Sequence, residues 1–346
     1  MASVTGKKIV EEVSGWLRVY DDGTVDRSWT GPLELKFFVD SVPPRSEFID
    51  GVALNDVVID PNTNLSVRMY IPQTEHSTIS DNDNRIPKLP LVLHFHGGGF
   101  CFSQADWYLY YHFYANLVRR ARLVLVSVYL PLAPEHKLPS ACDTAFAAFK
   151  WLGSVARGES RDPWLNDLAD FKRVFLIGDS TGGNIVHDVA ARAGSIGDQS
   201  VKLAGAIALH PGFQRAKLWR SFNEKTEMPF LTRDMINRFM DLAVPVASEA
   251  SKDHPIINPM GPHAPPLVGL NFPPVMVAVA EEDLLIDTEL EYCEAMKEAG
   301  KEVEIVVSQG MGHCFYLNKV AMESDPKTVL EGEKFLQAII GFINKH

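Results

Sequence analysis

The sequence predicts an α/β fold with a mainly parallel central sheet and helices on both faces. From Leu89 onward, apolar runs of strand length alternate with helical patterns, which is typical of a parallel sheet covered by helices. Residues suited to chemistry follow directly after several of these runs, and parallel sheets place their sites at the carboxyl ends of strands. The expected strands after the first one are 123–128, 174–177, 203–209, 275–280 and 303–307.

The segments before and between these strands complete the expected organisation. Residues 16–20 and 24–27 flank Asp22-Gly23, a strong hairpin signal. Residues 57–59 and 65–70 bracket a turn and predict antiparallel edge strands, and the polar stretch 74–88 predicts an exposed loop. The stretch 212–246 interrupts the alternation and is interpreted as a helical excursion. We expect one domain over residues 1–346, because α/β folds of this length commonly form one large core.

A serine stands at the corner between one expected strand and the helix after it. Gly178-Asp179-Ser180-Thr181-Gly182 follows the run 174–177 and precedes the helical pattern 185–191, which is the layout of a nucleophile elbow. Small residues are needed on both sides of the serine because its backbone is strained and a Cβ there would collide with the adjoining strand or helix. Taken alone, the string is also compatible with an ordinary turn.

A glycine-rich run at the end of an earlier strand favours the catalytic interpretation. His96-Gly97-Gly98-Gly99 follows the apolar run 91–95, where backbone N–H groups can hold the oxyanion of an acyl-transfer reaction. Side chains at these glycines would block that approach. A phosphate loop is disfavoured, since the run lacks the Lys-Ser/Thr ending of a P-loop and the spacing of a dinucleotide fingerprint.

An acid and then a histidine are expected further along the chain. The histidine is His313, which follows the strand 303–307. Another candidate, His210, ends the strand before the acid and is interpreted as a surface or satisfied core histidine. Spacing alone leaves the acid open among four residues near the end of the strand 275–280: Glu281, Glu282, Asp283 and Asp287.

Five motifs spread over most of the chain carry a family resemblance. They are His96 to Phe100, Leu132 to His136 with Leu138-Pro139, Gly178 to Asn184, Asp283 to Asp287, and Gly312 to Phe315. In these motifs the chain resembles the plant-type carboxylesterases of the hormone-sensitive-lipase branch of the α/β-hydrolases. That branch also contains the gibberellin receptors and some alkaloid-forming hydrolase-like cyclases.

The resemblance implies an α/β-hydrolase fold and assigns the site residues. It makes Ser180 the nucleophile, His313 the base and Asp283 its orienting carboxylate, which settles the choice of acid. It implies an oxyanion hole built from the N–H groups of Gly98, Gly99 and Thr181, with His96 and Gly97 in the same motif. The implied reaction is hydrolysis of a small-molecule carboxylic ester through an acyl-enzyme, with no metal or organic cofactor.

The resemblance also implies a cap over Ser180, formed by residues 1–48 and 212–246. Candidate pocket residues are Phe100, Phe213 and Trp219. The chain departs from the family pattern at Leu130-Pro131, where many members have Tyr-Arg, and over Gln214 to Ser221. The second stretch usually helps to cover the pocket, so its change bears on substrate preference more than on the chemistry.

Composition excludes several classes of partner. The chain has 33 Lys and Arg against 44 Asp and Glu, a formal net charge of −11 without a basic cluster, which argues against nucleic acid or an anionic membrane surface. Four cysteines without paired short spacing indicate neither a zinc site nor a disulfide framework. No apolar leader or membrane-length run is present, so a cytoplasmic location is expected. The oligomeric state is not predicted.

Two other functions remain to be weighed. A hormone-binding protein would resemble the gibberellin receptors, which have lost the catalytic histidine, and the presence of His313 argues against it. A specialised biosynthetic enzyme, removing an ester from an alkaloid or terpenoid intermediate or cyclising it, would keep the same triad. The sequence does not separate it from a simple esterase.

Overall fold

The computed structural model describes residues 6–73, 87–197, 199–228, 230–245 and 253–346. Within them the chain forms a nine-stranded sheet with strand order β12-β11-β10-β9-β7-β8-β6-β5-β4. Its strands are β4 (Arg45–Ile49), β5 (Val52–Asp60), β6 (Leu65–Pro72), β7 (Leu89–Phe95), β8 (Val124–Val128), β9 (Ala169–Asp179), β10 (Leu203–Leu209), β11 (Val275–Ala280) and β12 (Val303–Ser308). Of the expected loop over 74–88, residues 74–86 lie outside the described residues.

The sheet is parallel over six neighbouring strands. β8, β7, β9, β10, β11 and β12 pair in parallel, whereas β4, β5 and β6 pair antiparallel at the other side. The prediction of a mainly parallel sheet is confirmed. The antiparallel pair expected near residues 57–70 is present as β5 and β6, but the edge strand is β4.

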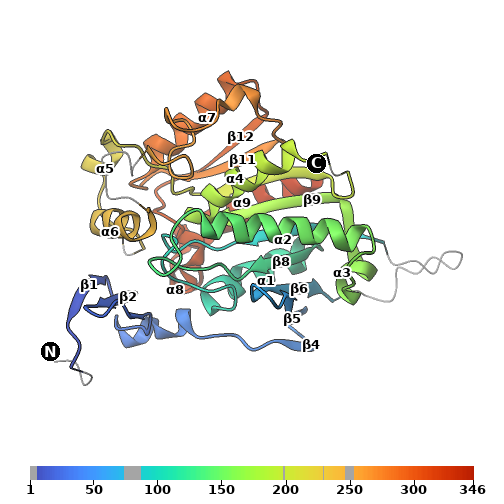
Figure 1. Ribbon diagram of the computed structural model, residues 1–346, viewed down its shortest axis with the longest axis horizontal. Helices are drawn as coiled ribbons and strands as arrows, with labels where there is room; N and C mark the ends of the chain where they lie inside the picture. The colour runs from blue at the N-terminus through green and yellow to red at the C-terminus, as the bar shows by residue number, and fades with distance from the viewer. Residues whose placement is uncertain (1–5, 74–86, 198, 229, 246–252) are drawn as a thin grey trace, which may run out of the picture.

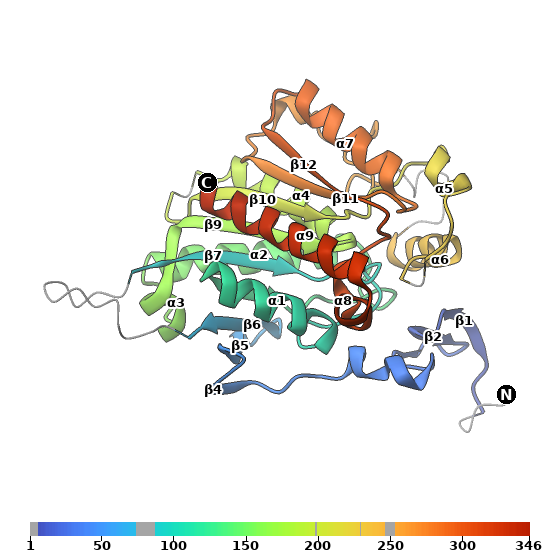
Figure 2. The ribbon, with the colours of Figure 1, turned by 180° about the vertical axis from the view of Figure 1, so that it is seen from behind.

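Helices cover both faces of this sheet. The helix α2 (Ser140–Ala156) packs beside α4 (Thr181–Ser195) on one face (Figure 1), and α1 (Tyr108–Ala121) packs beside α9 (Pro326–Lys345) on the other (Figure 2). The remaining helices are α3 (Pro163–Leu168), α5 (Arg220–Glu224), α6 (Arg233–Ala243), α7 (Ile286–Glu298) and α8 (Lys319–Ser324), with short 3₁₀ helices η1 (Leu33–Val39), η4 (Leu267–Gly269) and η5 (Phe315–Leu317).

Local sequence explains the longest of these helices. In α9 the Asp325 side chain caps the first turn by accepting from the backbone N–H of Thr328, and Pro326 occupies the first turn. Its buried residues recur at helical spacing: Phe335, Leu336, Ile339, Phe342 and Ile343. This stripe packs on the sheet while the polar face meets solvent. The fully buried β7, in contrast, is apolar almost throughout, as the central strand of a covered parallel sheet must be.

The two segments assigned to the cap lie at the same end of the molecule. A separate three-stranded sheet, β1 (Ile9–Val13), β2 (Leu17–Tyr20) and β3 (Val25–Asp26), and the helices α5 and α6 gather at this end (Figures 1 and 2). The predicted hairpin around Asp22-Gly23 is the pair β2 and β3. Glu11 on β1 forms an ion pair with Arg238 on α6, which joins the two segments.

The N-terminal segment is also tied to the main body. Trp16 stacks on Phe102 with ring centroids 4.5 Å apart. The Arg27 guanidinium donates to both carboxylate oxygens of Glu135, at 2.8 and 2.6 Å, and to the carbonyl oxygen of Ala133 at 2.8 Å. Bidentate pairing of this kind fixes orientation as well as distance. No helix in the described ranges is long and apolar enough to cross a membrane.

Candidate active site

Ser180 lies at a sharp turn between β9 and α4. Its φ and ψ are 52° and −122°, a conformation that L residues rarely adopt and that must be held by its surroundings. Three backbone hydrogen bonds hold it: Ser180 N–H donates to Leu209 at 2.8 Å, and its carbonyl accepts from Gly183 at 2.8 Å and Gly212 at 3.0 Å. A Cβ at Gly182 would lie 2.0 Å from the carbonyl oxygen of Phe95, so the turn requires glycine there.

A continuous hydrogen-bonded chain joins Ser180, His313 and Asp283. The Nε2 atom of His313 lies 2.9 Å from Ser180 Oγ, and its Nδ1 atom lies 2.6 Å from Asp283 Oδ2. Asp283 follows β11 and His313 follows β12, so adjacent parallel strands bring the two side chains to the same edge of the sheet. The geometry lets His313 remove a proton from the serine hydroxyl while the carboxylate fixes its tautomer.

The other acids near this strand end point elsewhere. Asp287 accepts from the backbone N–H of Ser221 at 2.7 Å. Glu281 accepts from the N–H of Gly310 at 2.7 Å, and Glu282 pairs with a lysine of the cap, Lys225, at 3.2 Å. Among the four candidates, Asp283 alone reaches the imidazole of His313 in the described structure.

Burial and charge set the protonation of this pair. Burial opposes the charged imidazolium, but the Asp283 carboxylate beside it outweighs burial and raises the pKa of His313 well above its ordinary value. Burial likewise opposes the charged carboxylate, but attraction to His313 and its hydrogen bond lower the pKa of Asp283. Asp283 is therefore the ionised partner, and His313 is a stronger base than a free imidazole.

The residues expected to form the oxyanion hole line the same cavity as Ser180. Gly97, Gly98, Gly99 and Thr181 line the same cavity as Ser180 and His313. Within the described chain, no backbone carbonyl accepts from the N–H of Gly98 or Gly99, and Thr181 opens α4, where the first N–H groups have no partner in the helix. Gly98 has φ +97° and its Cβ would lie 2.2 Å from the carbonyl of Phe102, so only glycine fits.

His96 supports this loop from behind. It is buried, and its Nδ1 atom lies 2.9 Å from Ser103 Oγ and 3.0 Å from the carbonyl oxygen of Gly97. Burial lowers the pKa of His96 to about 4, so the ring is neutral near pH 7. The side chain holds the backbone of the glycine run rather than facing the reaction.

A buried network around Asp179 was missed by sequence reasoning. Its carboxylate accepts from His94 Nε2 at 2.8 Å, from the Tyr114 hydroxyl at 2.7 Å and from the Tyr316 hydroxyl at 2.5 Å. These donors come from β7, α1 and η5. The acid precedes Ser180 inside the serine motif, but nothing in the local pattern shows that three distant elements converge on it.

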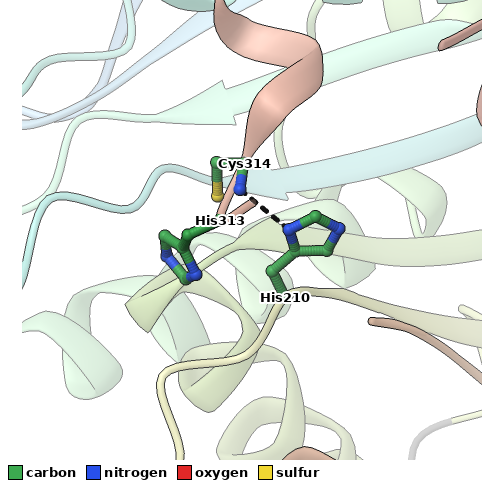
Figure 3. Close-up of side chains that lie close together, drawn as sticks. All are labelled: His210, His313 and Cys314. Atoms are coloured by element: carbon green, nitrogen blue, oxygen red, sulfur yellow. Dashed lines mark hydrogen bonds between the residues drawn. The ribbon is translucent and has the colours of Figure 1, made fainter. Parts of the chain in front are cut away.

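His210 anchors the loop that carries His313. Its Nδ1 atom accepts from the backbone N–H of Cys314 at 2.8 Å, as Figure 3 shows. Burial lowers the pKa of His210 to about 3, so the ring is neutral and its proton sits on Nε2, which has no hydrogen-bond partner in the described chain. Cys314 has φ +49°, and this hydrogen bond stabilises that turn.

The same three residues form one of the sets of possible metal-ligand atoms at the site. Atoms of His210, His313 and Cys314 lie within 4.8 Å of one another. Both ring nitrogens of His313 are already bonded to Ser180 and Asp283, so an ion here would disrupt that chain. Burial raises the pKa of the Cys314 thiol, which keeps it protonated and a poor ligand or nucleophile.

A second buried carboxyl, Glu289 on α7, lies next to the pair. Oxygen or nitrogen atoms of Asp283, Glu289 and His313 lie within 4.8 Å of one another. Glu289 is fully buried, and neither of its carboxyl oxygens has a hydrogen-bond partner among the residues described. Burial, followed by repulsion from Asp283, raises the pKa of Glu289 well above its ordinary value. The raised pKa favours the neutral form of Glu289 beside the ionised Asp283.

The cavity in front of Ser180 is small and mainly apolar. Its volume is about 70 Å³, and its walls come from the N-terminal segment, the glycine run, α1, residues 230–240 and the loops after β10, β11 and β12. The apolar residues of the wall include Trp16, Phe102, Leu109, Phe230, Leu231, Met235, Ile236, Phe239, Met240, Leu285 and Leu317.

The three aromatic residues expected in the pocket lie outside this wall, which corrects the sequence-based expectation. Phe213 packs against Tyr292 with ring centroids 4.4 Å apart. Trp219 belongs to a separate apolar cluster with Phe222, Leu231, Ile236, Leu284 and Leu285. Phe100 is buried in the main core. Aromatic character marked these residues, but the direction of each side chain depends on tertiary packing.

Comparisons with known proteins agree with this architecture. A family model described as the alpha/beta hydrolase fold matches residues 92–317. The chain is 36% identical over 313 residues to a probable carboxylesterase 6 of Arabidopsis thaliana, covering 89% of this chain and 85% of that protein. It is 34% identical over 324 residues to a 2-hydroxyisoflavanone dehydratase of Glycyrrhiza echinata, covering 91% and 92%.

Solved structures show the same similarity. A hyperthermophilic esterase from the archaeon Pyrobaculum calidifontis superposes with a TM-score of 0.67 at 25% identity, covering 87% of this chain and 86% of that one. Family match, relatives and architecture converge, and the chain belongs to the alpha/beta hydrolase fold family.

Proposed function

We propose that this protein is a serine carboxylesterase that hydrolyses a small-molecule carboxylic ester through an acyl-enzyme. The observation that carries the proposal is the chain Ser180–His313–Asp283, with contacts of 2.9 and 2.6 Å, at the wall of an apolar cavity. The relative named carboxylesterase supports the same chemistry.

The first half-reaction forms the acyl-enzyme. Nε2 of His313 takes the Ser180 proton as Oγ attacks the ester carbonyl carbon, and Asp283 stabilises the imidazolium that results. The carbonyl oxygen becomes an oxyanion that accepts hydrogen bonds from the N–H groups of Gly98, Gly99 and Thr181. The imidazolium then gives its proton to the departing alcohol. In the second half-reaction His313 takes a proton from a water molecule, which attacks the acyl carbonyl carbon. The bond to Ser180 Oγ then breaks, Oγ takes the proton back from His313, and the carboxylic acid is released.

The backbone donors matter for rate as well as for geometry. Removing one oxyanion donor typically raises the barrier by about 2.7–4 kcal/mol. Two of the donors belong to Gly98 and Gly99, whose Cβ positions are filled by other atoms, and the third belongs to Thr181 at the start of α4. Donors fixed in this way need no rearrangement when charge develops. Residues 1–48 and 212–246 form the cap in this proposal, supported by Trp16, Phe230 and Phe239 in the cavity wall.

A second candidate is a specialised biosynthetic enzyme that uses the same base for elimination or cyclisation. The observation that favours it is the similarity to a protein named 2-hydroxyisoflavanone dehydratase, at nearly the identity of the carboxylesterase. In that case His313 would remove a proton from the substrate and Ser180 would not need to be acylated. A hormone receptor without catalysis is disfavoured, since His313 and Asp283 are both present and in contact.

The test compares Ser180→Ala with Ser195→Ala, a serine at the end of the same helix whose hydroxyl bonds the carbonyl of Arg192. Turnover of 4-nitrophenyl esters and covalent labelling by a fluorophosphonate are measured by absorbance and intact mass. We expect Ser180→Ala to lose turnover by several orders of magnitude and to escape labelling, with Ser195→Ala unchanged. Near-normal turnover in Ser180→Ala would contradict the esterase proposal.

A further inference from the structure

The wall of the cavity contains one side-chain amide, Gln214. The other side chains around the cavity that carry a polar group belong to Trp16, Tyr110, Asp179, Ser180, Thr181, His313 and Cys314. The Tyr110 hydroxyl donates to Ser103 Oγ at 3.1 Å. Asp179 already accepts three hydrogen bonds, and Ser180 and His313 are bonded to each other. Gln214 therefore differs from the rest of the wall, as a side chain with two donors and an acceptor that the reaction itself does not use.

The backbone of Gln214 is held by hydrogen bonds, whereas its amide has no hydrogen-bond partner among the described residues. Its N–H donates to the carbonyl of Ile257 at 3.1 Å, and the preceding carbonyl, of Phe213, accepts from Thr288 Oγ1 at 2.7 Å. The residue is 4% exposed. Its side chain forms no hydrogen bond with any residue in the described ranges. A fixed backbone that presents an unbonded amide to a cavity is a built recognition group.

The segment that carries Gln214 is joined to the Ser180 turn. Two residues before it, Gly212 donates its N–H to the carbonyl of Ser180 at 3.0 Å, and a Cβ on Gly212 would touch Thr181 Cγ2 at 3.1 Å. The hydroxyl of Thr181 is also buried without a hydrogen-bond partner in the part of the chain that the structure describes. Two polar side chains without a hydrogen-bond partner in the described ranges thus belong to segments beside the Ser180 turn, whereas the wall contributed by residues 230–240 is apolar.

Unbonded polar groups at a cavity discriminate between substrates. A plain alkyl chain that fills the space displaces water from the amide without replacing its hydrogen bonds, which weakens binding. A substrate with a hydroxyl or carbonyl oxygen next to the amide replaces the hydrogen bonds that the water made. Sites that hydrogen-bond a substrate polar group select against analogues that lack it.

We infer that Gln214 is a specificity-determining residue, and that the substrate class is carboxylic esters bearing a hydroxyl or carbonyl oxygen within a few bonds of the reacting carbonyl. The inference rests on the proposed esterase function. The size of the cavity limits that group: about 70 Å³ compares with roughly 10–15 Å³ for one water molecule in the same measure. The part of the substrate held there has only a few heavy atoms.

The test is a ratio of kcat/KM values for matched esters. On the acyl side, 4-nitrophenyl butyrate is compared with the 2-hydroxy- and 3-hydroxybutyrate esters; on the alcohol side, propyl butyrate is compared with 3-hydroxypropyl butyrate. The variant is Gln214→Leu, which keeps similar volume and removes every hydrogen bond. The control is Gln337→Leu, an exposed glutamine on α9 that bonds Glu333.

We expect wild type to prefer at least one hydroxylated ester, and Gln214→Leu to lower that preference about fivefold to tenfold, the effect of one lost hydrogen bond. Gln337→Leu should leave all ratios unchanged. If Gln214→Leu changes no ratio by more than twofold while the plain esters are still hydrolysed, the inference is wrong and the esterase proposal stands. If wild type hydrolyses none of the esters, the esterase proposal fails and this inference fails with it.

Discussion

Trp219→Ala separates a structural role from a substrate-binding role in the cap. Trp219 is 3% exposed, packs against Phe222 with ring centroids 5.0 Å apart, and donates from Nε1 to the carbonyl of Leu284 at 2.6 Å. Truncating a buried aromatic residue to alanine typically costs about 3–5 kcal/mol of unfolding free energy. Because Leu284 follows Asp283 directly, we expect activity to fall alike for small and bulky esters.

A second substitution separates the ring from its hydrogen bond. The Leu284 carbonyl also accepts from Ser221 Oγ at 2.8 Å, so Trp219→Phe leaves that oxygen bonded and keeps most of the ring. Its cost should be near that of one net hydrogen bond, about 0.5–1.5 kcal/mol. The free energy of unfolding in urea and the turnover of two esters of different bulk measure both effects.

The matched control is Phe230→Ala, because Phe230 lines the cavity and is only partly buried. This variant should change the preference between small and bulky acyl groups with a smaller loss of stability. The reasoning about Trp219 is refuted if Trp219→Ala shifts that preference severalfold while its unfolding free energy stays near wild type.

Three other predictions concern Asp283, His313 and Glu289. Asp283→Asn should lower kcat by roughly 10⁴-fold, the size seen when a triad carboxylate becomes an amide. Asp287→Asn should change kcat far less, because the Asp287 carboxylate accepts from the backbone N–H of Ser221. Equal losses would contradict the assignment of Asp283. The proposed base works only when neutral, so kcat/KM should rise with pH through the raised pKa of His313. In Asp283→Asn the residual rise of kcat/KM should occur at lower pH. A pH profile of kcat/KM measures both. The pKa of Glu289 is raised in the folded chain. As pH rises above the ordinary pKa of 4.5, the unfolded chain therefore releases a proton that the folded chain keeps, and the free energy of unfolding falls. Glu289→Gln should therefore gain unfolding free energy relative to wild type between pH 5 and pH 8, and a pH-independent difference in urea unfolding would show that the acid is not held neutral.

The parts of the site that sequence could predict are those with local chemical requirements. The serine turn needs glycine at Gly178 and Gly182, and a backbone oxyanion hole needs the run ending at Gly99, so both leave contiguous patterns in the chain. Buried parallel strands also appear in the sequence as apolar runs of defined length. These runs predicted the order of the strands and of the site segments that follow them. These patterns arise because backbone geometry, rather than a distant partner, restricts the residue type.

Features that depend on side-chain direction could not be predicted in this way. Four acids lie within seven positions after β11, and tertiary contacts alone decide that Asp283 faces His313 while Asp287 faces the cap. The same limit explains the pocket. Trp219 has the aromatic character expected of a pocket residue, but its indole donates to the carbonyl of Leu284. Gln214, in the same altered stretch, lines the cavity instead.

Asp179 shows how a residue outside the triad can fix the distance within it. Its carboxylate lies one position before Ser180 and accepts from Tyr316, three positions after His313. Burial raises the pKa of Tyr114 and Tyr316 well above the ordinary value, so both phenols stay protonated and keep donating. A shift of the end of β9 relative to the loop after β12 would leave this buried carboxylate with unsatisfied lone pairs, which is costly in a low-dielectric interior. The network therefore holds Ser180 and His313, the proposed nucleophile and base, in register through contacts other than their direct hydrogen bond.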